Sequence, residues 1–431
     1  RRSLRKPQKR MNDNCATRHV ARSAMFSTYQ KTGRDINLDS NTQMKYLTRI
    51  LILLHLTTIS VCAEELPAGF IKGSEERRER ISLGGNFRPS PNAPVFVAVG
   101  HGGRILMSRD DGKSWSQVHW GYPGSDHGLW ATKAIAYTGG VFVVPIGWGA
   151  ATAWLASEDG ETWRHLTSGK TQLTGIKDAD GDPSVMPGTW GIAGGKGVFV
   201  TGGYMMMGAT PDFGKTITTF ALHKFKQNPR SRKLVTHHVG PVYCGDTSGR
   251  FLALGNDRSK ENPVFGNLYG SDDLGQSWIW LEPMLLNEKC NGYSGIVSNG
   301  ETVLIADKEA ATVFISANAG DTWEGPFPTG TAGASLSMVG TEFWLLGRKA
   351  ARTSLDGKTW YDLPKGIPTG KIVASPDGTL ISIDRRRCNI LRSTDSGETW
   401  GEVHRFQPET ENVHGAQGLR DIVFGYTANK R

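Results

Sequence analysis

Cysteine is scarce in this chain, and its five copies show no metal-binding pattern. No Cys-x-x-Cys pair and no Cys/His pattern has the spacing of a zinc site. Cys15 and Cys62 precede residue 64, which leaves Cys244, Cys290 and Cys388 beyond it. If the chain is exported, one disulfide can form among these three. We expect Cys244 to pair with Cys290, since both lie near corresponding strands of adjacent repeats.

An excess of positive charge is also missing from the part of the chain that we expect to fold. The chain has 50 Lys/Arg and 41 Asp/Glu. Twelve of the basic and three of the acidic residues precede residue 64, so 38 of each remain after it. A neutral balance gives a phosphate backbone little to bind, so we expect no nucleic-acid partner.

No apolar run is long enough to span a bilayer comfortably. Residues 50–61 are apolar, follow Lys45 and Arg49, and end at small residues, which is the order of a secretory signal peptide. The chain begins with Arg1, and residues 1–43 lack apolar periodicity. We therefore predict a secreted or periplasmic protein without a transmembrane segment in its mature chain. Its predicted parts are a disordered leader or upstream translation (1–43), a signal peptide (44–63), a linker (64–85) and one folded domain (86–431).

A short turn sequence that recurs seven times is the main feature of the folded part. Its full form is Ser/Thr-x-Asp-x-Gly-x-Ser/Thr-Trp, and copies begin at residues 108, 157, 210, 271, 316, 354 and 393. Asn318 replaces the Asp in one copy, and Ile217 replaces the Trp in another. In such a turn the hydroxyl and carboxylate can bond to backbone N–H groups, Gly permits a positive φ, and Trp buries its ring.

The spacing of this turn motif predicts the fold. The copies are 38 to 61 residues apart, with short apolar segments such as 134–137, 141–146 and 153–156 between them. A period near 40 with strands and tight turns is typical of propeller blades with four strands each. We predict an all-β, seven-bladed β-propeller. Residues 419–426 would complete a first blade that begins with 95–99, so that the ring closes without an exposed edge.

The seven turns resemble the Asp-box, or bacterial neuraminidase repeat, of the sialidase-like β-propellers, over about residues 86–431. The resemblance implies that the turns lie between the third and fourth strands, on the face opposite the active site. It also implies a structural role for their polar residues, which are Asp110, Asp159, Asp212, Asp273, Asn318, Asp356 and Asp395. The function that it implies is binding, and in an enzyme cleavage, of an acidic glycan of the sialic- or uronic-acid type on that opposite face.

The sialidase apparatus itself looks incomplete. Family members hold the sialic carboxylate with three Arg, the first in a Phe/Tyr-Arg-Ile-Pro motif, and here Phe87-Arg88-Pro89 lacks the Ile. The family's acid/base Asp should fall before the first turn copy, but residues 89–107 contain no Asp or Glu. If the chain is an enzyme, we therefore expect either a sialidase-like glycoside hydrolase or a uronate polysaccharide lyase. In a lyase, His127 or His238 would take the proton α to the carboxylate.

Basic and aromatic residues in the connections on the presumed functional face are the candidate ligands of the glycan. Guanidinium groups suit a carboxylate, and aromatic rings stack on sugars. The candidates for substrate binding are Arg88, Arg104, Arg258, Arg348, Arg386, Trp148, Tyr204 and Tyr293, and those for catalysis are His127, His238 and Asp126. The alternatives are solvated loop charges for the Arg residues and ordinary loop or core roles for the His residues.

No cofactor is expected. Asp178, Asp180 and Asp182 form part of a calcium-loop pattern, but the later Glu of an EF-hand is missing, and an Asp/Gly turn explains them as well. We expect a monomer whose partner is an acidic carbohydrate or glycoconjugate. The competing function class is a non-catalytic propeller that serves as a scaffold for protein assembly, which an aromatic, uncharged rim would favour.

Overall fold

The computed structural model describes residues 93–100, 103–119, 132, 134–146, 153–165, 189–203, 206–212, 218–221, 235–258, 265–281, 293–307, 310–332, 334–347, 349–384, 389–405 and 418–427. For some strand ends within these ranges only the backbone is described. In this part of the chain no helix has the length and hydrophobicity needed to cross a bilayer. The described elements are all strands, and they form seven sheets of four antiparallel strands each.

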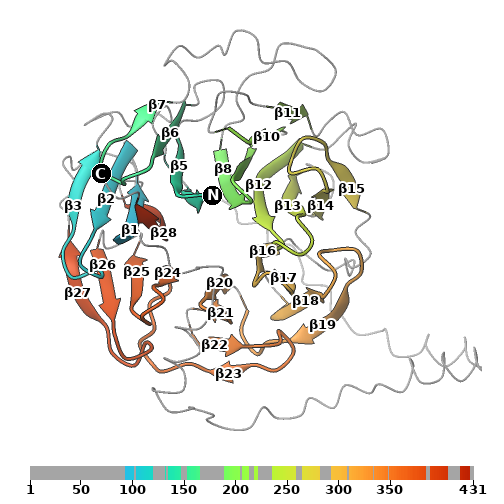
Figure 1. Ribbon diagram of the computed structural model, residues 1–431. Helices are drawn as coiled ribbons and strands as arrows, with labels where there is room; N and C mark the ends of the chain where they lie inside the picture. The colour runs from blue at the N-terminus through green and yellow to red at the C-terminus, as the bar shows by residue number, and fades with distance from the viewer. Residues whose placement is uncertain are drawn as a thin grey trace, which may run out of the picture. The chain divides into compact units, whose positions relative to one another are not determined.

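The sheets are the blades of a seven-bladed β-propeller, and we number them in chain order (Figure 1). Blade 1 consists of β28 (Leu419–Thr427), β1 (Ala93–Gly100), β2 (Arg104–Ser108) and β3 (Ser116–His119). Blade 2 consists of β4 (Ala136–Thr138), β5 (Val141–Ile146), β6 (Ala153–Ser157) and β7 (Arg164–His165). Blade 3 consists of β8 (Thr189–Gly195), β9 (Val198–Gly203), β10 (Met206–Thr210) and β11 (Thr218–Ala221).

The remaining four blades have the same order of strands. Blade 4 consists of β12 (Val235–Tyr243), β13 (Phe251–Arg258), β14 (Phe265–Ser271) and β15 (Ile279–Leu281). Blade 5 consists of β16 (Tyr293–Ser298), β17 (Val303–Asp307), β18 (Thr312–Ser316) and β19 (Glu324–Pro328). Blade 6 consists of β20 (Ser335–Val339), β21 (Glu342–Leu346), β22 (Ala351–Ser354) and β23 (Tyr361–Asp362). Blade 7 consists of β24 (Lys371–Ala374), β25 (Leu380–Asp384), β26 (Asn389–Ser393) and β27 (Gly401–Arg405).

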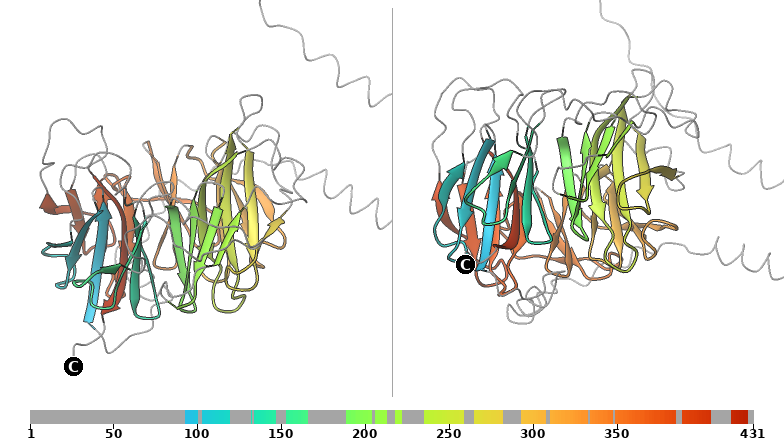
Figure 2. Two further views of the ribbon diagram at one scale, coloured as in Figure 1. Left: turned by 90° about the horizontal axis from the view of Figure 1, so that it is seen from above. Right: turned by 45° about the horizontal axis from the view of Figure 1, so that its top comes forward.

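The first strand of every blade lies innermost and contacts the first strand of the next blade, from β28 through β4 to β24 and back to β28. Figures 1 and 2 show these strands around the centre of the ring. The predicted closure is confirmed, because the C-terminal β28 pairs with β1 from Ala93↔Thr427 to Gly100↔Leu419. Pairing the first and last described strands in one sheet removes the open edge that an unfinished blade would expose.

The core lies between adjacent blades, since the strands are apolar on both faces. In β1 the last six of eight residues are buried, and β9 and β17 are buried throughout. Phe96 and Phe424 of blade 1 pack edge to face, 5.1 Å apart, in one cluster with Ile381 and Ile390 of blade 7. Trp360, which is fully buried, lies in a cluster shared by blades 5 and 6. Each blade is therefore stabilised mainly by its two neighbours.

The turn motif lies between the third and fourth strands of every blade and has one hydrogen-bond pattern. In all seven copies the first hydroxyl bonds the Asp or Asn oxygen two residues on, at 2.7 to 3.2 Å. In six copies the Gly N–H donates to that hydroxyl at 2.7 to 2.9 Å. In the same six the Trp Nε1 donates to the Gly carbonyl at 2.9 to 3.1 Å. Hydroxyl, carboxylate, Gly and Trp are thus all used within the turn.

The Gly of the turn motif is also the point at which one blade approaches the previous one. Gly112 has a φ of 79°, and a Cβ built on it would lie 2.3 Å from Ile381 Cδ1 of blade 7. Gly275 would meet Val200 of blade 3 at 2.7 Å in the same way. A larger residue would strain the backbone and push two blades apart. The motif therefore sets blade spacing as well as the turn.

The strands predicted from sequence are confirmed with small shifts, among them 141–146 as β5, 134–137 as β4 and 153–156 as β6. The expected disulfide is wrong, because Cys244 is a free, buried thiol. Cys244 follows β12 at the end that carries the turn motifs, whereas β16, the strand that follows Cys290 in the chain, begins at the opposite end. Two residues can therefore lie near corresponding strands of adjacent blades and still be at opposite ends of those blades. Cys290 lies outside the described residues.

Candidate functional site

The ring has two unlike faces. The turn face carries the turn motifs and the connections between first and second strands, and the mouth face lies at the other end of every blade, where the first strands begin. An antiparallel order puts alternate connections at alternate ends, so every first strand starts on the mouth face. Both β12 and β24 begin there, at Val235 and Lys371.

Four of the seven innermost strands carry a bulge near the mouth face. The register of β28 against β1 jumps from Asp421 to Leu419, so that Arg420 is the extra residue. The same occurs at Trp190 in β8 and at Ser294 in β16. In β12, His238 and Val239 together stand opposite Gly255. Bulges bend a strand and redirect side chains, and they are frequent next to binding sites.

Three predicted site residues come together along the mouth face of blades 4 and 5. His238 lies in the bulge of β12, and Arg258 is the last residue of β13, where it pairs with Val235. Tyr293 is the first residue of β16, the innermost strand that lies next to β12. Their backbones therefore reach one region of the mouth, although they are 20 to 55 residues apart in the chain.

A carboxylate and an ammonium lie on the other side of the mouth, where blades 7, 1 and 2 meet. Asp421 Oδ2 accepts from the backbone N–H of Ile135, at 3.1 Å, just before blade 2 begins. Asp421 Oδ1 lies 3.8 Å from Nζ of Lys371, the first residue of β24. The sequence analysis missed both residues. The available signal was a pair of charged residues, Arg420 and Asp421, inside an otherwise apolar strand.

Arg104, a predicted ligand of the glycan, is almost fully buried, with 6% of its surface exposed. It is the first residue of β2 and lies close to His404 of blade 7. Partial burial, together with the positive charge of Arg104, lowers the pKa of His404 below its usual range. Such burial leaves Arg104 little surface for a ligand.

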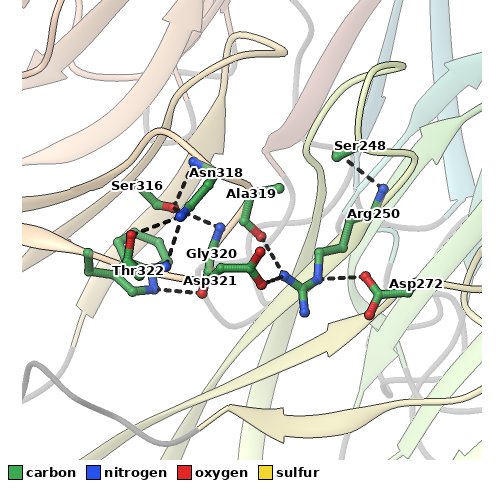
Figure 3. Close-up of polar contacts among 10 residues, drawn as sticks. Ser248, Arg250, Asp272, Ser316, Asn318, Ala319, Gly320, Asp321 and Thr322 are labelled. Atoms are coloured by element: carbon green, nitrogen blue, oxygen red, sulfur yellow. Dashed lines mark hydrogen bonds and ion pairs between the residues drawn. The ribbon is translucent and has the colours of Figure 1, made fainter.

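The turn face has a pocket of about 510 Å³ between blades 4 and 5, and Figure 3 shows polar contacts of residues that line it. At its base is Arg250, which is 6% exposed. The Nη1 atom of Arg250 donates to Ala319 O at 3.3 Å and to the carboxylate of Asp321, and Nε lies 2.9 Å from Asp272 Oδ1. Asp272 belongs to the turn motif of blade 4, and Ala319 and Asp321 to that of blade 5. Arg250 is thus engaged as a link between blades.

Neither a nucleophile nor a metal site is apparent in this pocket. Burial raises the pKa of the Cys244 thiol, which lines the pocket, to about 12, and Arg250 offsets only part of that effect. A thiol with such a pKa stays protonated at neutral pH and reacts poorly. Among the residues that the structure describes, no group of three or more His, Cys, Asp or Glu side chains is placed to hold a metal ion.

Several predicted residues lie outside the described residues, and their roles stay predictions. These are Arg88, Asp126, His127, Trp148, Tyr204, Arg348 and Arg386, together with Asp178, Asp180 and Asp182 of the calcium pattern. Only the backbone is described for His238, Arg258 and Tyr293, so their roles also stay predictions.

Comparisons with known proteins give no family or function for this chain. No family model and no curated protein matches it. Among solved structures, a candidate 6-phosphogluconolactonase from Bacteroides fragilis is similar, with 11% identity, a TM-score of 0.49, and coverage of 78% of this chain and 100% of that one. Also similar is a GH74 enzyme from Niastella koreensis, with 14% identity, a TM-score of 0.27, and coverage of 72% of this chain and 53% of that one. A nidogen/laminin complex is similar with 9% identity, a TM-score of 0.41, and coverage of 77% of this chain and 98% of that one. At these scores we draw no function from them.

Proposed function

We propose that the chain is an exported propeller that binds an acidic glycan, of the sialic- or uronic-acid type, at its mouth face. The observation that carries this proposal is the set of four bulges, which all lie at the mouth end of innermost strands. Blades 2, 6 and 7 form without a bulge in the innermost strand, so the fold does not require one there. The presence of the bulges at one end supports a site at that end.

Charge supports an acidic ligand. Arg258 is the last residue of β13 and His238 lies in the bulge of β12, both at the mouth end of blade 4. A guanidinium group can bind a carboxylate through two parallel hydrogen bonds. The described Arg109, Arg250 and Arg392 of the turn face are each paired with a carboxylate, and so are Arg352 and Arg405, which leaves Arg258 as the residue that carries this part of the proposal.

Cleavage is a further step of the proposal. A hydrolase needs two carboxylates across the cleft, and Asp421 is one described carboxylate at the mouth. A uronate lyase instead needs a base near the α proton, for which His238 is the candidate. Both reactions release new reducing ends, so reducing ends without ultraviolet absorbance would identify a hydrolase, whereas reducing ends together with the absorbance of an unsaturated uronate would identify a lyase.

Calorimetric titration of the purified protein with oligogalacturonate, 3′-sialyllactose and neutral lactose tests the binding. We expect one acidic ligand to bind, with lactose much weaker, and Arg258→Ala to weaken it about tenfold through loss of a charged hydrogen bond. Arg109→Ala, on the turn face, is the matched control and should bind as the wild type does. The proposal fails if neither acidic ligand binds, or if Arg258→Ala and Arg348→Ala both leave the affinity unchanged.

Export rests on the predicted signal peptide in residues 44–63. Expression of the full chain in a secreting host, followed by N-terminal sequencing of the protein from the medium or periplasm, tests it. A first residue close to Glu64 is expected. Retention of the whole chain inside the cell would contradict export without affecting the glycan proposal.

A further inference from the structure

Lys371 and Asp421 form a loose ion pair at the mouth, where blades 7 and 1 meet. Lys371 begins β24, and its side chain is 44% exposed. Asp421 lies beside the bulge of β28, and its side chain is 17% exposed. The Nζ and Oδ1 atoms are 3.8 Å apart, which exceeds a direct charged hydrogen bond of about 2.8 Å.

The carboxylate of this pair is fixed in place. Asp421 Oδ2 accepts from Ile135 N at 3.1 Å, and Oδ1 accepts from Ile422 N at 3.0 Å. The pairing of β28 with β1 is regular from Asp421 onward, and the extra residue Arg420 comes directly before it. These contacts hold the carboxylate between Ile135, just before blade 2, and Lys371 of blade 7.

The ammonium of this pair keeps donors for another group. Among the described residues, Asp421 is the one carboxylate that pairs with Lys371, and the pair is too long for a direct hydrogen bond. An ammonium carries three donors. At 44% exposure the Lys371 side chain is accessible from solvent.

A hydroxyl group fits between these two charges better than an anion does. Its oxygen can accept from Lys371 Nζ while its proton is donated to Asp421 Oδ1. An oxygen about 2.8 Å from both atoms can bridge a gap of 3.8 Å. A carboxylate in the same place would be repelled by Asp421.

We propose that Lys371 and Asp421 form a hydroxyl-binding subsite that selects a polyhydroxylated ligand. The inference rests on the proposed function, and it divides the mouth into two parts. The acidic group of the glycan lies on the side of blades 4 and 5, near Arg258, and a sugar hydroxyl bridges Lys371 and Asp421 on the side of blades 7 and 1. Recognition then needs both the charge and the hydroxyl.

Lys371→Met is the direct test, because Met keeps the length of the side chain and removes the charge and the donors. We expect its affinity for oligogalacturonate or 3′-sialyllactose, whichever binds the wild type, to fall about tenfold or more at an unchanged melting temperature. Lys371→Arg, which keeps a donor, should recover part of the loss. Lys358→Met is the matched control, since Lys358 pairs with Glu324 at 2.6 Å on the turn face and should not affect binding.

Chemical labelling gives a second readout that does not depend on a variant. An amine-reactive acetyl ester should modify Lys371 less when the binding ligand is present, and Lys358 equally with and without it. Normal binding by Lys371→Met, or no protection of Lys371 while the wild type binds, overturns the subsite but leaves the proposed function standing. Absence of binding by the wild type instead overturns the proposed function and this inference with it.

Discussion

The turn face and the mouth face of this propeller use polar residues in opposite ways. On the turn face, Ser, Asp, Gly and Trp recur in every blade with few exceptions, and their polar atoms bond within four residues of one another. On the mouth face, the innermost strands differ from blade to blade, and four of them have a break in strand register.

This difference separates what maintains the ring from what can bind a ligand. A group that is saturated within its own turn has no hydrogen bond left to offer, so repetition on the turn face reflects stability. The carboxylates of the turn motif come close to this, since Asp110 accepts three hydrogen bonds from within its own turn. Irregular positions at the mouth interrupt the ladder and occur in four of the seven innermost strands, which makes them the better candidates for function.

Among the changes to the turn motif, Trp360→Ala should lower the stability of the protein most. Trp360 is fully buried between blades 5 and 6, and its Nε1 donates to Gly357 O at 2.9 Å. Removing the ring should lower the free energy of unfolding by about 3 to 5 kcal/mol. Denaturant unfolding measures this change. Trp323→Ala, at a partly exposed copy of the motif, should cost less, and an equal cost would show that burial does not rank the copies.

Gly112→Ala tests whether the motif sets the spacing of the blades. A methyl group there meets Ile381 of blade 7 in addition to a backbone with positive φ, so we expect a loss of about 2 to 4 kcal/mol. Gly140→Ala is the control, because Gly140 also has a positive φ of 82° but nothing within 4 Å of the added Cβ. Its loss should be about 1 kcal/mol, measured in the same denaturation series. If both variants lose the same free energy of unfolding, Gly112 is needed for the turn conformation but does not set the spacing of the blades.

Low pH should lower the stability of the turn motifs by less than either of these substitutions does. Burial tends to raise the pKa of Asp110, but hydrogen bonds from Ser114 and Ser108 outweigh it and lower the pKa from 3.8 to about 2. The pKa of Asp159 is lowered to about 2, since bonds from Thr162 and Glu161 likewise outweigh burial. A lowered pKa means that the stabilisation is complete above about pH 4 and is lost as the pH falls toward 2.

Melting temperatures between pH 5 and pH 2 measure this loss, and the natural Asn318 copy supplies a comparison. Asn318 makes equivalent bonds without a titrating group, at 2.9 Å to Thr322 N and 2.8 Å to Thr322 Oγ1. Asn318→Asp should therefore steepen the decline below pH 4 and leave the melting temperature near neutral pH almost unchanged. If the melting temperatures of the wild type and Asn318→Asp fall equally between pH 5 and pH 2, the turn carboxylates do not cause the loss of stability in acid.

The residues of the turn motif were sufficient to predict most of the fold. Local chemistry made the turn recognisable, and its spacing gave the number of blades and the closure by residues 419–426. The bonds from Trp Nε1 to the Gly carbonyl were not expected. The disulfide between Cys244 and Cys290 was expected wrongly, because the sequence positions did not show at which end of a blade Cys244 lies.

The candidate site was predicted far less completely. Arg258, His238 and Tyr293 were expected on the mouth face, and the backbone brings all three to that region. Asp421 and Lys371 were missed, since residues 50 apart in sequence meet only when β28 closes the ring beside β24. Arg104 was expected at the mouth, but it is buried against blade 7.

The sequence by itself determined the repeated unit: a hydroxyl, a carboxylate and a Gly within five residues form the turn through short-range bonds, wherever the blade lies. The tertiary structure alone decided which blades are neighbours across the closure and where the strands bulge. Only there do Lys371 and Asp421 come within 3.8 Å and does Gly112 contact Ile381. Local hydrogen bonds depend on residues a few positions apart, whereas strand register and blade contacts depend on the packing of the whole ring.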